Sequence, residues 1–240
     1  MSHPVLIVRT GAPIASLGTP TDYDPWFAGR MAAFDVDVHA WDAQRGAPAP
    51  EHLDWAAVLI TGSAASVHDR EEWSERAGAW CVRALNAGVP ILGVCYGHQL
   101  LAHALGGRSG PNPNGPEYGM GLVEVLVDDP LFDADRFQSY QLHFDVVREV
   151  PDGARVLARS QTTDVQAMAI GDRCRTVQWH PEFDAAYVRG AIERRRSLLE
   201  PYGDDFVDRN VASIVELPDG GGAIARFLEH IAGVPRTTAP

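Results

Sequence analysis

Short apolar runs alternate with stretches of helical periodicity in the first half of the chain. The runs are strand-like in length and rich in β-branched residues, and they fall at residues 5–8, 36–41, 57–60 and 90–94. Between them, apolar residues recur at helical spacing over residues 24–34 and 71–87. Near-continuous apolar strands that alternate with helices predict a mainly parallel sheet covered on both faces.

The second half of the chain follows a different pattern. Residues 121–127 and 154–158 alternate in part between apolar and polar positions, which is typical of antiparallel strands. Residues 165–170 and 174–179 flank the dipeptide Gly171-Asp172, a signal for a β-hairpin. From about residue 185 onward the spacing of apolar residues is helical.

Together these patterns predict an α/β fold. We expect a flavodoxin-like, open, mainly parallel sheet with helices on both faces, antiparallel strand additions and extra C-terminal helices. No linker composition divides the chain, so residues 1–240 are expected to form a single domain. Its core covers about 4–190, and a helical extension covers about 184–234.

Composition narrows the classes of function. The formal net charge is -12, and all 20 basic residues are arginine. So acidic a surface repels phosphate backbones and anionic lipid, which argues against nucleic-acid and membrane partners. Without lysine, the chain lacks a Schiff-base amine and a phosphate-loop lysine. The N-terminus has no signal-peptide pattern, and three cysteines give no disulfide framework, so we expect a cytoplasmic protein without a metal or another cofactor.

The sharpest chemical feature is Cys95, which lies between an apolar strand and a helical stretch. Glycines stand two residues away on each side, at Gly93 and Gly97. A nucleophile on a tight strand-to-helix turn needs such small neighbours, and the helix N-terminus behind it stabilises an anion. The alternative is a small buried cysteine that only packs, which is our interpretation of Cys81 and also suits Cys174.

A cysteine nucleophile needs a histidine and a third group that orients the ring. His180-Pro181-Glu182 offers both, because side chains two residues apart in an extended segment point to the same side. Pro181 disfavours the helical conformation for the residue before it and keeps this segment extended. The other histidines show no metal-ligand spacing, and packing or solvent exposure explains them better.

These two motifs resemble the class I (triad) glutamine amidotransferase family, and they are most like the amidotransferase domain of GMP synthetase. Three further segments are similar to that family: 59–67 resembles its oxyanion strand-loop, 117–119 a short motif before the next strand, and 139–145 the segment that borders the glutamine pocket. The resemblance covers roughly residues 4–190 and fades in the C-terminal helices.

The resemblance implies hydrolysis of the glutamine side-chain amide through a thioester, with Cys95, His180 and Glu182 as the catalytic triad. It places the oxyanion donors at the backbone N–H groups of Tyr96 and Ser63. It also implies substrate contacts from Gln99, Gly62 and His143. The chain departs from the family at Ser63-Ala64, where a glycine and a proline are usual, and a positive φ at Ser63 would be strained.

Three functions remain open. The first is a glutamine amidotransferase or glutaminase that works alone or feeds ammonia to a separate synthetase partner. The second is a γ-glutamyl peptidase or hydrolase with the same triad. The third is a non-catalytic regulatory module on the same fold. The basic run 193–196 in the C-terminal helices is interpreted as a solvated face, with a docking patch as the alternative.

Overall fold

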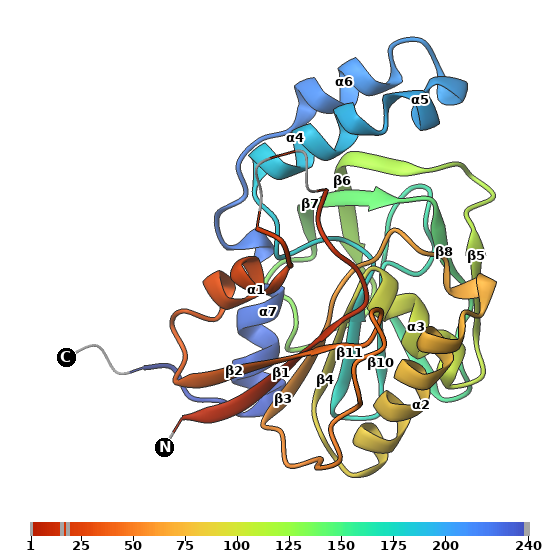
Figure 1. The fold of residues 1–240 in the computed structure, drawn as a ribbon. Coiled ribbons are helices and arrows are strands. Elements are labelled where there is room, and N and C mark those ends of the chain that lie inside the picture. Colours follow the sequence, from red (N-terminus) through yellow and green to blue (C-terminus); the bar gives the residue numbers. More distant parts are fainter. Residues whose placement is uncertain (1, 15–16, 18–19, 238–240) are drawn as a thin grey trace.

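The computed structural model describes residues 2–14, 17 and 20–237. Within these residues, one nine-stranded sheet has the order β2-β1-β3-β4-β11-β10-β9-β6-β7 (Figure 1). Its strands are β1 (His3–Arg9), β2 (Val36–Asp42), β3 (Ala57–Ile60), β4 (Ile91–Val94), β6 (Glu117–Val125), β7 (Arg136–His143), β9 (Ala154–Arg159), β10 (Ala167–Ile170) and β11 (Cys174–Val177). A small second sheet pairs β5 (Arg108–Pro111) with β8 (Asp145–Glu149).

The helices connect and cover these strands. They are α1 (Asp24–Arg30), α2 (Glu72–Asn86), α3 (Tyr96–Ala104), α4 (Ala185–Arg194), α5 (Arg196–Leu199), α6 (Phe206–Ser213) and α7 (Ala223–Arg226). Short 3-10 turns lie at η2 (Val67–Asp69), η3 (Glu200–Tyr202) and η4 (Pro218–Gly221), and α7 continues as the π-helical turn Phe227–Ala232. No helix in the described part of the chain is long and apolar enough to cross a membrane.

The directions of the strands confirm the predicted mixture. Strand β1 pairs in parallel with β2 and β3, β3 pairs in parallel with β4, and β4 with β11. Beyond β11 every pairing is antiparallel, and the predicted hairpin is β10–β11. The order β2-β1-β3-β4 is that of flavodoxin-like sheets, whose sites lie at the carboxyl ends of the strands.

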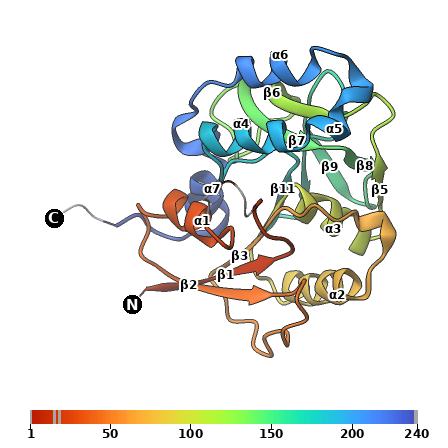
Figure 2. The same ribbon diagram turned by 45° about the horizontal axis from the view of Figure 1, so that its top comes forward.

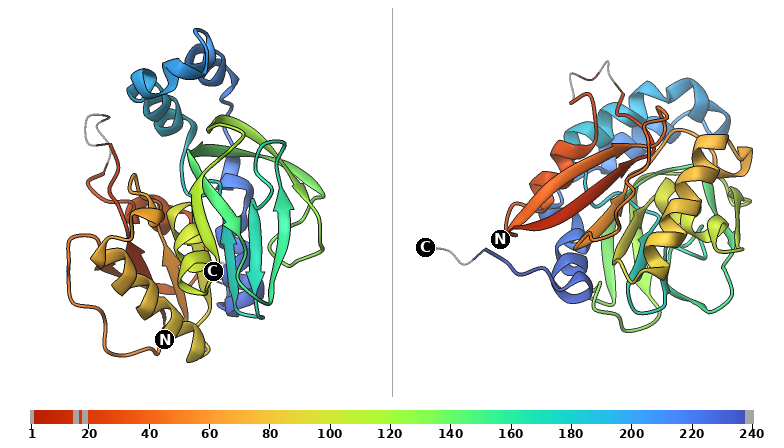
Figure 3. Two further views of the ribbon diagram at one scale, coloured as in Figure 1. Left: turned by 90° about the vertical axis from the view of Figure 1, so that its right-hand side faces the viewer. Right: turned by 60° about the horizontal axis from the view of Figure 1, so that its bottom comes forward.

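Alternate residues of the central strands pack into two different hydrophobic cores. Val5 and Ile7 of β1 belong to the cluster that contains Phe27 of α1 and Phe227, whereas Leu6 and Val8 belong to the cluster of α2 and α3. Figures 1 and 3 show α1 and α7 on one side of these strands and α2 and α3 on the other. Burial of each such side chain contributes roughly 1.5–3 kcal/mol, which explains why these strands are apolar along their whole length.

The C-terminal helices do not form one uniform extension. Helix α4 packs on β6, β7 and α6, and α6 also packs on β6, so that α4, α5 and α6 gather above these strands (Figures 1 and 2). Helix α7, by contrast, returns to the central sheet and contacts α1. The helical prediction for this region is therefore confirmed, and its last helix belongs to the main core.

Candidate active site

Four segments meet at the carboxyl ends of the parallel strands. Thr10 follows β1, Thr61-Gly62-Ser63 follows β3, Cys95 follows β4, and residues 178–182 follow β11. The segments are tied together by buried hydrogen bonds. Thr10 donates its backbone N–H to Oγ1 of Thr61 at 3.0 Å, and the backbone N–H of Cys95 donates to the carbonyl of Val177 at 2.8 Å.

Cys95 has a backbone conformation that is rare outside tight turns. Its φ of 50° is positive, and among the described non-glycine residues only Arg70 shares this property. The flanking glycines are needed at this turn. A Cβ on Gly93 would lie 2.6 Å from the carbonyl oxygen of Gly97, and a Cβ on Gly97 would lie 2.8 Å from Cβ of Ile60. The sequence pattern Gly-x-Cys-x-Gly thus has a steric cause, and the strained residue is the one that bears the thiol.

His180 is held from two sides. Its Nδ1 lies 2.7 Å from Oε1 of Glu182, and its ring stacks on Phe183 with 4.6 Å between ring centroids. Its backbone N–H donates to the carbonyl of Tyr140 at 2.9 Å. Glu182 is fully buried, so its carboxylate has few partners other than the imidazole. The predicted contact between the two side chains is therefore present, whereas the backbone bends at residues 181 and 182 instead of continuing as an extended segment.

The imidazole also meets the sulfur of Cys95. Burial alone would lower the pKa of His180, but the charge of Glu182, the contact with Cys95 and hydrogen bonds to both raise it to about 10. Gly62 lies where the two side chains approach each other. A Cβ at this position would lie 2.9 Å from Cε1 of His180 and 3.7 Å from Cβ of Cys95. The structure thus brings Cys95, His180 and Glu182 together in one line of contacts, with His180 as an imidazolium at neutral pH.

The segment predicted to supply an oxyanion donor borders the same cavity. Ser63, Cys95 and Tyr96 all line it, and Tyr96 is the first residue of α3. Ser63 has a negative φ, so the expected strain at the Ser63-Ala64 departure does not arise. Gly62 does not line this cavity, and its missing side chain leaves room for the His180 ring.

The cavity above the sulfur has a volume of about 440 Å³. Its walls come from the loop after β3, the start of α3, strands β6 and β7, and the C-terminal helices. The lining residues are Ser63, Ala64, Ala65, Ser66, Cys95, Tyr96, Gln99, Tyr118, Leu142, His143, Phe144, Asp145, Arg195 and Leu198. A cleft of this size is typical of small-molecule sites.

Gln99 lines the cavity and connects two of its walls. Its Nε2 donates to the carbonyl of Asp145 at 2.9 Å and to Oε1 of Gln178 at 3.1 Å. Gln178 in turn donates to Sγ of Cys95 at 3.6 Å. Gln178 is a site residue that the sequence motifs did not predict, although it stands only two residues before His180.

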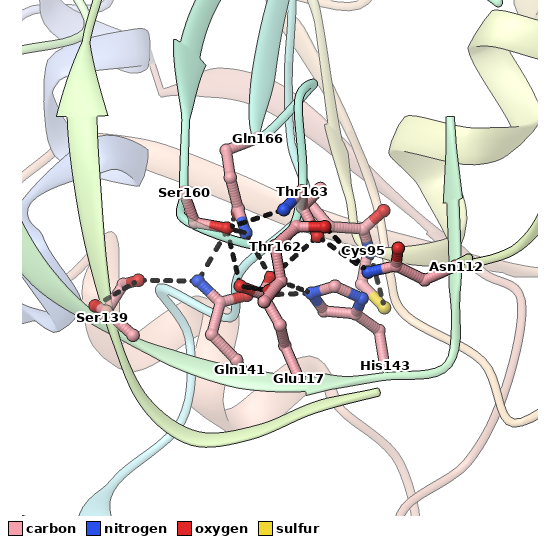
Figure 4. A network of polar contacts seen from close by, with 12 residues as sticks. Cys95, Asn112, Glu117, Ser139, Gln141, His143, Ser160, Thr162, Thr163 and Gln166 are labelled. Carbon is pink, nitrogen blue, oxygen red and sulfur yellow. Dashed lines mark hydrogen bonds and ion pairs between the residues drawn. The ribbon is translucent and has the colours of Figure 1, made fainter. Parts of the chain in front are cut away.

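His143 belongs to a buried polar network beside the cysteine (Figure 4). Its Nε2 lies 3.0 Å from Oε2 of Glu117, and its Nδ1 has no hydrogen-bond partner among the described residues. The Glu117 carboxylate also accepts hydrogen bonds from Ser160, Thr162, Thr163 and Gln166. Burial alone would raise the pKa of Glu117, but His143 and these hydroxyl groups lower it to about 2. An ionised Glu117 therefore receives the Nε2–H of His143.

The other described histidines and cysteines do not line this cavity, although Nδ1 of His68 lies 3.3 Å from Oδ2 of the lining residue Asp145. His98 belongs to α3 and is fully buried, burial lowers its pKa to about 3, and Oγ1 of Thr176 lies 2.7 Å from its Nδ1. Cys81 and Cys174 are fully buried, and burial raises the pKa of Cys174 to about 12. Across residues 2–14, 17 and 20–237, no group of three or more histidine, cysteine or acidic side chains is arranged to hold a metal ion.

Comparison with known proteins relates this geometry to a family. The model of the family "Glutamine amidotransferase class-I" matches residues 27–193. The glutamine-hydrolyzing GMP synthase of Aeropyrum pernix is 42% identical over 60% of this chain, and that of Thermomicrobium roseum is 32% identical over 88%. This chain spans only 28% and 39% of the lengths of these two enzymes.

Two further similarities cover most of both proteins. Gamma-glutamyl peptidase 2 of Arabidopsis thaliana is 29% identical over 72% of this chain and 73% of its own length. The crystal structure of a glutamine amidotransferase from Thermotoga maritima aligns with a TM-score of 0.73 and 20% identity, over 97% of this chain and 99% of that one. At this identity the structural match shows the fold.

Proposed function

Since the chain belongs to the class I glutamine amidotransferase family, we propose that it hydrolyses the side-chain amide of glutamine through a thioester on Cys95. One observation carries this proposal. A buried imidazole is linked both to the sulfur at the head of α3 and to a buried carboxylate. A nucleophile, a base and an orienting group in this arrangement are the parts that acyl transfer requires.

The reaction follows from these positions. Sγ of Cys95 attacks the amide carbon, and a C–S bond forms as the carbonyl oxygen becomes an oxyanion. His180 then protonates the amide nitrogen, the C–N bond breaks, and ammonia leaves. In the second half, His180 removes a proton from water, which attacks the thioester and releases glutamate and the free thiol. Glu182 stabilises the imidazolium throughout.

Backbone groups stabilise the oxyanion in this proposal. The N–H of Tyr96 at the start of α3 and the N–H of Ser63 are the donors, because both residues border the cavity beside Cys95. The amino-acid end of the substrate extends towards Gln99 and His143, which line the cavity. Gly62 supports the reaction indirectly, since only a glycine leaves space for His180.

The destination of the ammonia is a separate question. The 240 residues contain no lysine for a phosphate-binding loop. We propose that this domain therefore activates no acceptor with ATP itself, and either hydrolyses glutamine for its own sake or delivers ammonia to a synthetase that binds it. A partner-dependent enzyme shows weak glutaminase activity alone and a sharp rise when the partner is added. The cytoplasmic location remains a prediction from the sequence.

A second candidate function is hydrolysis of larger γ-glutamyl amides. It is favoured by the similarity to Gamma-glutamyl peptidase 2, which covers 72% of this chain and 73% of that protein. The triad and the chemistry are the same, and only the amine that leaves is larger.

Glutamate release from glutamine and from a γ-glutamyl dipeptide tests the proposal. We expect the wild-type protein to release glutamate from at least one of them and Cys95→Ala to release at least about 10³-fold less. Cys81→Ala is the matched control, because Cys81 is a fully buried cysteine that belongs to the packing cluster of α2 and α3. Equal rates for Cys95→Ala and the wild type would overturn the proposal, and so would an inactive wild type.

A further inference from the structure

The cavity above Cys95 is lined by an arginine and an acidic residue that do not pair with each other. Among the described residues that line it, Arg195 is the only arginine and Asp145 is the only acidic residue. Glutamine carries both kinds of charge at its α-carbon, as an ammonium and a carboxylate group. The charges of the cavity are therefore complementary to those of the amino-acid end of the proposed substrate.

Arg195 reaches the cavity because α4 packs on β6 and β7, and β7 ends at the lining residue His143. Arg195 follows directly after α4 and is partly buried. Its Nη1 donates to the carbonyl of Ala191 at 3.3 Å, and it forms no ion pair with any described residue. Its neighbour Arg196, by contrast, is paired with Asp208 at 2.7 Å. The Arg195 guanidinium therefore has N–H groups left for an anionic group of a ligand.

The side chains of Gln99 and His143, which line the same cavity, offer acceptors to a ligand. Both N–H groups of the Gln99 amide are already donated, to the carbonyl of Asp145 at 2.9 Å and to Oε1 of Gln178 at 3.1 Å. His143 donates its Nε2–H to Glu117. Its Nδ1, which has no hydrogen-bond partner among the described residues, is therefore the acceptor of the neutral ring.

The carboxylate of Asp145 is a third acceptor. Its Oδ2 accepts a hydrogen bond from Ser66 at 2.6 Å and lies 3.3 Å from Nδ1 of His68, whereas its Oδ1 makes no hydrogen bond or ion pair with a described residue. An ammonium group donates hydrogen bonds and accepts none, so it is suited to these three acceptors. A carboxylate needs donors, and Arg195 is the cation that supplies them.

We propose that Arg195 binds the α-carboxylate of the glutamyl unit. This inference rests on the proposed function, in which Cys95 attacks the amide at the other end of that unit. A guanidinium binds a carboxylate through two parallel hydrogen bonds, which fix its orientation as well as its position. Substrates must therefore carry this carboxylate free. Glutamine and γ-glutamyl compounds do so, whereas glutamine inside a peptide chain does not, because its carboxylate is part of a peptide bond.

L-Glutamine and its α-amide isolate the carboxylate, because they are nearly equal in size and differ in one charge. We compare kcat/KM for the formation of glutamate from the first and of glutamate α-amide from the second. We expect the wild type to favour glutamine by roughly tenfold to a hundredfold, the effect of one charge-assisted hydrogen-bonded pair. In Arg195→Gln this ratio should fall to near one through loss of activity on glutamine alone, and in Arg195→Lys it should be intermediate.

Arg194→Gln is the matched control. Arg194 is exposed at the end of α4, and its substitution removes the same charge one residue away, so we expect the wild-type ratio. Thermal melting checks that each variant is folded. If the wild type cleaves γ-glutamylglycine and not glutamine, this dipeptide and its glutamyl α-amide take the place of the two compounds.

A binding measurement separates the subsite from the chemistry. Calorimetry on Cys95→Ala gives the Kd of glutamine and of its α-amide without turnover. We expect glutamine to bind more tightly by a similar factor, and we expect the double variant Cys95→Ala/Arg195→Gln to lose this preference.

Three results would overturn the inference and leave the Cys95 chemistry intact. Equal kcat/KM values for the two compounds in the wild type would show that the α-carboxylate is not recognised. An unchanged ratio in Arg195→Gln would assign its recognition to other groups, and an equal loss on both compounds would give Arg195 a structural role. If the wild type cleaves none of the compounds, the proposed hydrolysis fails, and calorimetry alone decides whether the subsite stands: a preference for glutamine that depends on Arg195 supports it, and equal Kd values reject it.

Discussion

Nδ1 of His180 lies 2.7 Å from Oε1 of Glu182, two residues further along the chain, and both side chains are buried. The pair is local in sequence, and the backbone bends at residues 181 and 182, where the two groups meet. The imidazole also contacts Cys95. The pairing of His180 with Glu182 therefore determines the charge of the base next to the sulfur.

Replacing the orienting carboxylate tests its proposed role. We expect Glu182→Gln to lower kcat by roughly 10²–10⁴-fold, because a neutral amide no longer stabilises the imidazolium and can hold the wrong tautomer. Steady-state release of glutamate measures the loss. Asp184→Asn is a suitable control, since this acidic residue follows closely in sequence but caps α4 through the N–H of Tyr187. A Glu182→Gln enzyme with wild-type kcat would contradict the assignment.

The raised pKa of His180 predicts a pH dependence of stability. Its ordinary value is 6.5 and its value in the folded protein is about 10, so the folded state holds this proton more tightly than the unfolded chain. The stabilisation is therefore fully present below pH 6.5 and is lost as the pH rises through about 10.

Urea unfolding between pH 6 and pH 10 measures this effect. We expect the free energy of unfolding to decline across this window in the wild type and to decline less in His180→Gln. Equal slopes in the two proteins would show that His180 is not the titrating group.

The apolar pattern was enough to predict the parallel half of the sheet. Strands that are buried on both faces leave little freedom in residue type, and β1, β3 and β4 coincide with the predicted runs within one or two residues. The nucleophile could be predicted for a related reason. The turn at Cys95 tolerates only glycine at Gly93 and Gly97, so its geometry is visible in the sequence.

The burial of polar side chains on strand β7 and the position of Arg195 at the cavity could not be predicted from the sequence in this way. Polar residues alternate along β7 at Ser139, Gln141 and His143, a pattern that suggests solvent, yet all three are buried in the network of Glu117. Their partners are distant in sequence, so the pattern alone could not reveal them. Arg195 was interpreted as part of a solvated basic run, and only the packing of α4 on β6 and β7 brings it to the cavity.

Gly62 gives a steric test of the site. A Cβ at this position would lie 2.9 Å from Cε1 of His180, so Gly62→Ala must displace the ring. A displacement of about 1 Å costs roughly 10²-fold in rate, and we expect a loss of this order in kcat/KM. Gly29→Ala is the control, because a Cβ there meets no atom within 4 Å. Similar activities of the two variants would show that a methyl group at residue 62 does not displace the ring of His180.

Glu117 is expected to matter for stability as well as for the site. Its carboxylate is paired with His143 and accepts four further hydrogen bonds, and its pKa of about 2 lies below the ordinary 4.5. This stabilisation is present above pH 4.5 and is lost as the pH falls through about 2. At pH 7 we expect Glu117→Gln to lower the free energy of unfolding by about 2–4 kcal/mol, because it leaves buried donors without an anionic acceptor.

Glu124 on the same strand provides the comparison for Glu117. It pairs with Arg136 at 2.8 Å and Arg159 at 2.9 Å on the surface of the sheet, where water and salt screen ion pairs and leave them little effect on stability. Urea unfolding of Glu117→Gln and Glu124→Gln should therefore differ clearly at pH 7, and the difference should shrink towards pH 2 as Glu117 becomes protonated. Equal losses in the two variants would mean that the buried network contributes no more than a surface pair, and that His143 is positioned by packing alone.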